Sequence, residues 1–169
     1  MHIRAGQESD AKAVHAIYSH HVLHGTASYD VDPPSLEQIG DKMRWILDEG
    51  WPFLVAEADG CVVGYSYATQ FRDRAAYRFT CENSIYVHPE WTGRGIGKEL
   101  LLALLERSAQ YGFRTMIAVI GGAEPASVRL HAGCGFAEVG RLKAVGWKKE
   151  RWLDSVYMQR DLFLPGIVT

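Results

Sequence analysis

The feature that most limits the fold is a short turn with three alternating glycines, Gly93-Arg94-Gly95-Ile96-Gly97-Lys98, set between a β-rich run and an amphipathic helical run. Glycines let a ligand approach the backbone closely, and the first N–H groups of a helix have no intrahelical partner. Such a turn is typical of a phosphate or pyrophosphate site. A turn that merely joins the two elements is the alternative, which the neighbouring cations Arg94 and Lys98 disfavour.

Two common phosphate-binding motifs do not fit this turn. A Walker A loop requires G-x-x-x-x-G-K-[ST], but Thr92 stands five residues before Gly97, and Glu99 follows Lys98. A dinucleotide fingerprint requires a third glycine where Lys98 stands, and an early βαβ unit. The sequence therefore predicts a phosphate-bearing ligand held in some other way.

The hydrophobic periodicity predicts an α/β fold with a mixed sheet, in the order β-α-α-β-β-β-α-β-α-β-β. The run Ser35–Gln38 has the form of a capping box, and Asp59-Gly60 is typical of a tight hairpin turn. The expected strands are 2–5, 52–58, 62–69, 79–87, 116–120, 136–142 and 155–162. The expected helices begin near residues 10, 36, 96 and 125 and end near residues 25, 50, 112 and 132.

The composition favours one ordinary domain over residues 1–169, because no linker, repeat or low-complexity block divides the chain. A net charge of -2 gives no field to attract nucleic acid or an anionic membrane. The cysteines Cys61, Cys81 and Cys134 are widely spaced, which indicates neither a disulfide framework nor a zinc site. Without a signal-peptide pattern or a long apolar run, a cytoplasmic protein is expected.

The segment Ile85-Tyr86-Val87-His88-Pro89-Glu90-Trp91-Thr92-Gly93-Arg94-Gly95-Ile96-Gly97 resembles the acetyl-CoA motif of the GNAT superfamily of N-acetyltransferases. Within that superfamily, the blocks 80–87, 118–122, 127–131 and 151–154 resemble the phosphinothricin and methionine sulfoximine N-acetyltransferase branch. The resemblance implies a GNAT-like acyl-CoA N-acyltransferase fold and a homodimer. It also implies transfer from acetyl-CoA to the α-amine of a small amino acid or analogue, in a ternary complex.

The resemblance also assigns residues to the cosubstrate. Backbone groups of Ile85, Tyr86 and Val87 would pair with the pantetheine arm, and the family usually has an Asn where Glu124 stands. A carboxylate cannot donate the hydrogen bond of that amide. The residues expected to contact acetyl-CoA are Ile85, Tyr86, Val87, Gly93, Arg94, Gly95, Ile96, Gly97, Lys98, Glu124 and Ser127.

Two residues are candidates for the chemistry. Acetyl transfer to an amine needs a base for the ammonium and a proton for the departing thiolate. Glu82 lies in a largely uncharged strand, where burial would raise its basicity, and the branch uses the equivalent Glu as general base. The alternative is a rim carboxylate in a salt bridge. His131 stands where the branch has a His, either to donate a proton, to position the thioester, or simply as a packed histidine.

The acceptor amino acid is expected to meet the loop 71–77. Arg72 or Arg74 can grip a carboxylate or phosphinate in bidentate fashion, although a solvated loop is the alternative. The residues expected to bind the acceptor are Tyr29, Arg72, Arg74, Ala75, Ala76 and Tyr77, with Thr26 and Ser28 beside Tyr29 on the opposite wall.

Several further patterns leave alternatives open. Trp147, Arg151 and Trp152 would shape a lid or a dimer contact. His20, His21 and His24 lack the partnered carboxylate or Cys of a metal site, so we expect a polar helix end and no metal. Acetylation of protein N-termini or lysines, or a non-catalytic CoA-binding module, remain competing functions. Cys81 is an improbable nucleophile because its side chain points away from that of Glu82.

Overall fold

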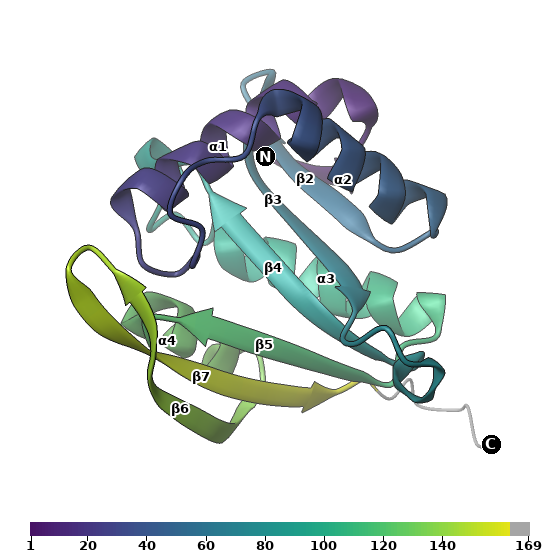
Figure 1. The fold of residues 1–169 in the computed structure, drawn as a ribbon. Coiled ribbons are helices and arrows are strands. Elements are labelled where there is room, and N and C mark those ends of the chain that lie inside the picture. The colour runs from purple at the N-terminus through teal and green to yellow at the C-terminus, as the bar shows by residue number, and fades with distance from the viewer. Residues whose placement is uncertain (163–169) are drawn as a thin grey trace.

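The computed structural model describes residues 1–162, which form one seven-stranded sheet with helices on both faces (Figure 1). The sheet order is β1-β2-β3-β4-β5-β7-β6, and the expected succession of strands and helices is confirmed. The strands are β1 (His2–Ala5), β2 (Phe53–Ala58), β3 (Cys61–Gln70), β4 (Thr80–Val87), β5 (Thr115–Gly121), β6 (Ala137–Lys148) and β7 (Arg151–Asp161). The helices are α1 (Ala11–His24), α2 (Leu36–Asp48), α3 (Ile96–Tyr111) and α4 (Pro125–Gly133).

The hydrophobic core has two parts, one on each face of the sheet. On β2, Phe53 and Val55 pack with α1 and α2, whereas Leu54 and Ala56 pack with α3. This alternation follows from the pleat, because neighbouring residues of a strand point to opposite faces. Both faces of the central strands are therefore covered.

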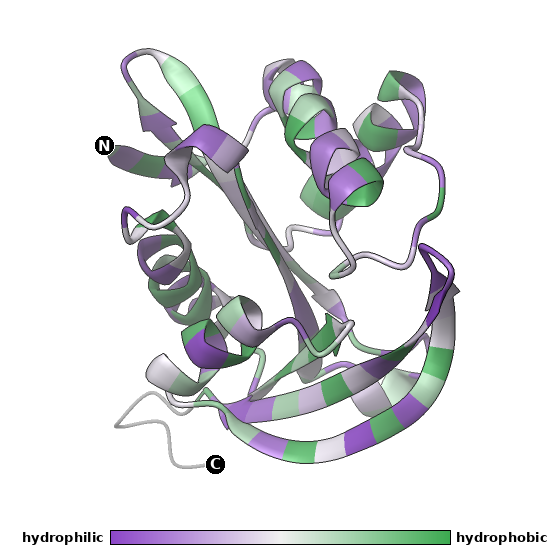
Figure 2. Cartoon of the chain, turned by 90° about the vertical axis from the view of Figure 1, so that its left-hand side faces the viewer, coloured by the Kyte–Doolittle hydropathy of each residue, from purple (hydrophilic) through white to green (hydrophobic). Residues whose placement is uncertain are grey.

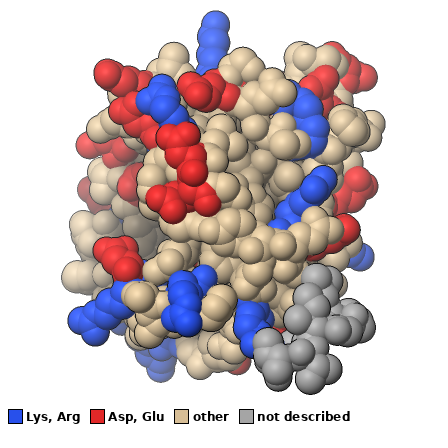
Figure 3. Space-filling view, turned by 90° about the vertical axis from the view of Figure 1, so that its right-hand side faces the viewer, with Lys and Arg blue, Asp and Glu red and all other residues tan. Residues whose placement is uncertain are grey.

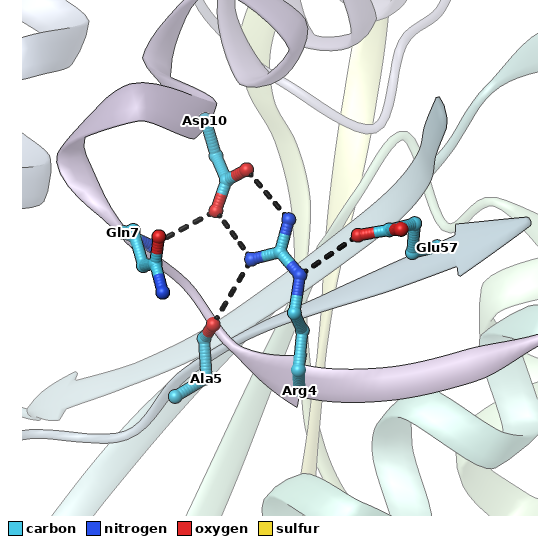
Figure 4. Close-up of polar contacts among 5 residues, drawn as sticks. All are labelled: Arg4, Ala5, Gln7, Asp10 and Glu57. Atoms are coloured by element: carbon cyan, nitrogen blue, oxygen red, sulfur yellow. Dashed lines mark hydrogen bonds and ion pairs between the residues drawn. The ribbon is translucent and has the colours of Figure 1, made fainter. Parts of the chain in front are cut away.

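An ionic network fixes the start of the chain (Figure 4). The guanidinium of Arg4 makes two hydrogen bonds of 2.8 Å to Asp10 and one of 2.9 Å to Glu57. Asp10 also accepts a hydrogen bond from the Gln7 amide, and the Arg4 guanidinium holds the pKa of this carboxyl below its usual value. Asp10 is the N-cap residue of α1, but its side chain makes no capping hydrogen bond to that helix; through Arg4, its carboxylate connects the residues preceding α1 to β1.

Strands β4 and β5 separate at one end of the sheet, as their arrowheads in Figure 1 show. They are parallel and pair only through Thr80–Glu82 and Thr115–Ile117. Beyond those pairs β4 continues to Val87 and β5 to Gly121, with a widening gap between them. The glycine-rich turn follows β4 and leads into α3, so it lies at this open end.

The last hairpin is longer than expected, and the boundaries 136–142 and 155–162 are wrong. Strand β6 runs to Lys148 and β7 starts at Arg151, so that Trp147 pairs with Trp152. The turn consists of Lys149 and Glu150, both with a left-handed φ (51° and 57°). Such a pair fits a two-residue hairpin turn, but without glycine it left no turn signal in the sequence.

The surface carries no dominant sign of charge on the face drawn in Figure 3, where acidic and basic side chains are interspersed. Along the curved strands at the bottom of Figure 2, hydrophobic and hydrophilic residues alternate. Within residues 1–162, no helix is long and apolar enough to cross a membrane.

Candidate active site

Two adjoining cavities occupy the open end of the sheet. The first, which we call the glutamate cavity, has a volume of about 310 Å³ and is lined by Glu82 and neighbouring residues of β4, β5 and the loop after α1. The second, the glycine-turn cavity, has a volume of about 420 Å³ and lies against the turn before α3. Both are lined by Ala27, Ile85, Tyr86 and Ser127. The two cavities therefore adjoin at these residues.

The glycine-turn cavity has the backbone geometry of an anion site. Gly93 (φ 75°) and Gly95 (φ 82°) both adopt left-handed conformations, and Gly95 is the N-cap residue of α3. The first N–H groups of α3 therefore point outward without intrahelical acceptors, at the positive end of the helix dipole. The expected cosubstrate residues that line this cavity are Ile85, Tyr86, Val87, Gly93, Gly95, Ile96, Gly97, Glu124 and Ser127.

The two cations of the turn lie outside the lining of this cavity. The Arg94 guanidinium lies 4.5 Å from the centre of the Trp91 ring and donates to the carbonyl of Glu90. Lys98 is likewise not among the lining residues. The cradle is thus formed chiefly by backbone, with Trp91 as an aromatic wall that the sequence analysis did not identify.

Helix α1 supplies another contact that the sequence analysis missed. The Nε2 atom of His21 lies 2.8 Å from the carbonyl oxygen of Val87, so the ring donates to the end of β4. The rings of His20 and His24 lie 4.5 Å apart between centroids and are tilted by 39°. Within the described residues, no group of three or more His, Cys, Asp or Glu side chains could hold a metal ion.

Glu124 caps helix α4. Its Oε1 accepts a hydrogen bond of 3.2 Å from the amide of Ala126, and Pro125 occupies the first turn. The carboxylate is suited to this position because it satisfies a free N–H group and stabilises the helix dipole. Glu124 lines the glycine-turn cavity, but its Oε1 already accepts a hydrogen bond at the start of α4.

Glu82 lies in the glutamate cavity with its side chain 33% exposed. Burial raises the pKa of its carboxyl, while the charges of Arg72, whose Nη1 lies 3.9 Å away, and of Lys42 oppose that rise. A carboxylate whose pKa is raised takes a proton from an ammonium more readily than an ordinary one. On the opposite face of β4, burial raises the pKa of the Cys81 thiol to about 12, so this residue stays a thiol.

His131 is buried, with 2% of its surface exposed, and it lines the glutamate cavity. Its Nδ1 atom lies 2.8 Å from the carbonyl oxygen of Ser127, and its Nε2 atom lies 3.0 Å from Oδ1 of Asn83. Burial lowers the pKa of the imidazole, and the backbone contact with Ser127 opposes that shift.

The loop after α1 forms another wall of the glutamate cavity, and the last hairpin holds this loop in place. The Tyr29 hydroxyl donates to the carbonyl of Asp154 at 2.8 Å and lies 2.8 Å from Ser155 Oγ. The buried Lys148 donates to the carbonyl of Ser28, also at 2.8 Å. Tyr29 and Ser28 line the cavity, and the hairpin's contribution was not expected because its strands were predicted too short.

None of the predicted residues of the acceptor loop, Arg72, Arg74, Ala75, Ala76 and Tyr77, lines the glutamate cavity. Arg72 alone among them approaches Glu82, at 3.9 Å, while Ala75–Tyr77 form an exposed 3-10 turn. Instead, α2 and β3 bring two unexpected residues to the cavity. Lys42 donates to the Tyr67 hydroxyl at 2.7 Å, and both side chains line the cavity.

The sequence matches the model of the acetyltransferase (GNAT) family over residues 15–136. The chain belongs to this family. The acetyltransferase is 47% identical over 161 residues to a phosphinothricin N-acetyltransferase of Alcaligenes faecalis, covering 95% of this chain and 82% of that one. It is 35% identical over 165 residues to an L-methionine sulfoximine/L-methionine sulfone acetyltransferase of Salmonella typhimurium, covering 96% and 95%.

A solved structure also resembles the acetyltransferase closely. A GNAT superfamily phosphinothricin acetyltransferase from Sinorhizobium meliloti, in complex with acetyl-CoA, superimposes with a TM-score of 0.93 at 46% identity. The match covers 95% of this chain and 87% of that one. The expected acyltransferase fold is thereby confirmed.

Proposed function

We propose that this acetyltransferase moves the acetyl group of acetyl-CoA to the α-amine of a small amino acid or analogue, such as phosphinothricin or methionine sulfoximine. The observation that carries the proposal is the meeting of the two cavities beside Glu82. One cavity has an anion-binding helix end, and the other has a carboxylate whose pKa is raised by burial. The names of the similar proteins agree with this pairing of substrates.

Acetyl-CoA would occupy the glycine-turn cavity as cosubstrate. The N–H groups at the start of α3 suit its pyrophosphate. The edge of β4 that β5 leaves unpaired at residues 85–87 suits the amide groups of its pantetheine arm, with the Val87 carbonyl already accepting a hydrogen bond from His21. This arrangement would direct the thioester to the junction lined by Ser127 and Tyr86.

Glu82 would act as the general base for the amine. The carboxylate takes a proton from the ammonium, directly or through a water, and leaves a lone pair on nitrogen for attack on the thioester carbonyl. The C–N bond forms, the C–S bond breaks, and the thiolate takes a proton, for which His131 is the candidate source. Direct transfer in a ternary complex needs no acyl-enzyme, and the raised pKa of Cys81 agrees with that route.

Cations beside Glu82 would recognise the acceptor. A free amino acid presents a carboxylate close to its amine, so a guanidinium that grips the carboxylate also aims the amine. Arg72 is near enough to Glu82 to do this, and Lys42 supplies a second positive charge on another wall. Tyr29 would close the opposite side of the site.

We further propose one domain over residues 1–169, a cytoplasmic location and a homodimer. The last seven residues of that domain lie outside the described residues. All three cysteines are free, as expected in a reducing compartment. The long hairpin ends the sheet with an unpaired edge and exposes Trp147 and Trp152 (56% and 64%), which favours a self-interface.

A screen for thiol release tests the acceptor class. The enzyme is mixed with acetyl-CoA and, in separate wells, free amino acids, phosphinothricin, methionine sulfoximine and short peptides, with Glu82→Gln as the matched control. We expect turnover with small free amino acids or their analogues and little with peptides. Turnover with peptides alone would overturn the acceptor class, and binding of acetyl-CoA without any turnover would indicate a CoA-binding module.

A further inference from the structure

Asn83 occupies the point where β4 and β5 separate. It follows Glu82 along β4, its side chain lies on the opposite face, and only 6% of its surface is exposed. Its Nδ2 atom donates a hydrogen bond of 3.2 Å to the carbonyl of Ile117, the last β5 residue paired with β4. The side chain thus adds one bond between the strands just beyond their last backbone pair.

That bond fixes which way the amide faces. The Ile117 carbonyl can only accept, so the NH₂ group of Asn83 must face it. The Oδ1 atom is left facing Nε2 of His131 at 3.0 Å. Because this oxygen also can only accept, the contact is a hydrogen bond only when Nε2 carries a proton.

The other ring nitrogen, Nδ1, has a hydrogen-bond partner whether or not it carries a proton. Nδ1 of His131 lies 2.8 Å from the carbonyl oxygen of Ser127 and 3.4 Å from its hydroxyl oxygen. With a proton, Nδ1 donates to the carbonyl; without one, it accepts from the hydroxyl. The Ser127 carbonyl is a partner only for a protonated Nδ1, but the Ser127 hydroxyl gives an unprotonated Nδ1 a donor. An unprotonated Nε2 has no such donor, because only the Asn83 oxygen faces it.

We propose that Asn83 is a positioning residue for acetyl transfer: it keeps the proton on Nε2 of His131 in both charge states, so that Nδ1 is the nitrogen that gains and releases a proton, next to Ser127. Its part in the transfer rests on the function proposed above. Ser127 lines both cavities. In the charged ring, the Nδ1 proton passes through the Ser127 hydroxyl to the sulfur that leaves when the C–S bond breaks, forming the thiol and a neutral ring; Nδ1 takes up a proton from water before the next transfer.

The surroundings of the ring agree with release of that proton. Burial lowers the pKa of His131, opposed by the Ser127 backbone contact. The Phe136 ring packs edge-on at 5.0 Å between centroids. Among the described residues, the hydrogen-bond partners of His131 are Asn83 and Ser127, and no ion pair involves this histidine.

The test is the tautomer of His131, read from the ring nitrogen shifts of the ¹⁵N-histidine-labelled enzyme by NMR. His131→Gln identifies the signals of this residue among the seven histidines. We expect the Nε2–H tautomer in the neutral wild-type ring and a switch to Nδ1–H in Asn83→Ala, where the Ser127 carbonyl is the remaining acceptor. An Nδ1–H tautomer in the wild type, or no switch in a folded Asn83→Ala, overturns the proposal.

Asn83→Asp provides a second variant, because it keeps an acceptor facing Nε2. We expect it to keep the Nε2–H tautomer and to raise the pKa of His131, measured by NMR titration, by about one unit or more. In kinetics, Asn83→Ala should lower kcat by about tenfold, as for one lost hydrogen bond, with the KM for acetyl-CoA unchanged within about twofold. A lower kcat with the tautomer unchanged would make Asn83 a merely structural residue.

These measurements separate the two proposals. The tautomer is read without any substrate, so failure to find an acceptor amine would overturn the proposed function and leave the assignment of the Nε2 proton standing. Turnover with an amino acid, together with an unchanged tautomer in Asn83→Ala, would overturn the positioning role alone.

Discussion

At the residue scale, Glu82 is the side chain for which activity and stability conflict. Burial raises its folded pKa above the unfolded value, so the native state ionises less readily than the unfolded chain. The resulting contribution to stability is present below the unfolded pKa and is lost as pH rises through the folded pKa. A carboxylate suited to take a proton thus destabilises the fold at neutral pH.

We expect Glu82→Gln to lower kcat by about 10²-fold or more, as for loss of a general base, while acetyl-CoA affinity stays unchanged. The deficit should shrink at high pH, where the amine is already partly deprotonated. The same variant should have a higher Tm than the wild type at neutral pH, and that gain should disappear in acid. A kcat deficit that stays constant from neutral to alkaline pH would argue for a structural Glu82.

Arg72 is the second residue at this scale, and Arg74 is its comparison. Arg72→Ala should raise the KM for a free amino acid by about tenfold to a hundredfold, the cost of a charge-assisted hydrogen bond. Arg74→Ala should have a smaller effect because, among the described residues, Arg72 approaches Glu82 and Arg74 does not. Steady-state kinetics with the free acid and its methyl ester provide the measurement. Equal use of both substrates by wild type and Arg72→Ala would place carboxylate recognition elsewhere, with Lys42 the next residue to substitute.

The sequence predicts candidates such as Glu82 because the motif around it is contiguous. Lys42 and Asn83 were not identified as site residues, because their importance depends on distant partners. In the sequence, Lys42 is an ordinary polar residue of an amphipathic helix, and only the folded structure shows that it contacts Tyr67. Asn83 requires knowledge of where β5 and α4 lie.

At the scale of elements, a feature that depends on residues close together in the sequence was predicted, whereas a feature that depends on the pairing of two strands was not. The capping box at Ser35 was predicted correctly because Ser35 and Gln38 bond each other within one turn. The turn at Lys149 and Glu150 was not predicted, because two non-glycine residues adopt left-handed conformations there. That conformation is maintained by the paired strands on either side, so it has no local sequence signal.

The turn before α3 yields a prediction with a matched control. Gly95 (φ 82°) and Gly60 (φ 75°) are both left-handed, and neither has an atom within 4 Å of an added Cβ. Alanine should therefore cost each variant a similar amount of stability, on the order of 1 kcal/mol. Only Gly95→Ala should weaken acetyl-CoA binding, by at least about tenfold, because its methyl group enters the anion cradle. Calorimetry measures the affinity of both variants for acetyl-CoA, and equal affinities would contradict the assignment of the pyrophosphate to this turn.

At the scale of the whole molecule, the last hairpin connects the proposed dimer to the acceptor site. Its outer strand exposes apolar side chains, while Lys148 near its tip holds Ser28 in the cavity wall. Dimerisation through this hairpin would therefore stabilise the position of Lys148 and, through it, the position of Ser28 in the cavity wall.

The double variant Trp147→Ser/Trp152→Ser should shift the protein from dimer to monomer at micromolar concentration, measured by sedimentation velocity. Trp45→Ser on α2 is the matched control, since Trp45 is also exposed but lies far from the hairpin in the chain. If the wild type is itself monomeric at these concentrations, the hairpin is not a self-interface.

The separation of β4 and β5 has a consequence for the lifetime of the protein. Three residue pairs and the Asn83 side chain join these strands, so β4 beyond them has an edge that β5 does not pair with, and such an edge can pair with another chain. A ligand bound along that edge covers it, and it stabilises the native state by about 2.7 kcal/mol at a hundred times its Kd. The cellular supply of acetyl-CoA would then determine how long each copy resists unfolding and aggregation, as well as how fast it works.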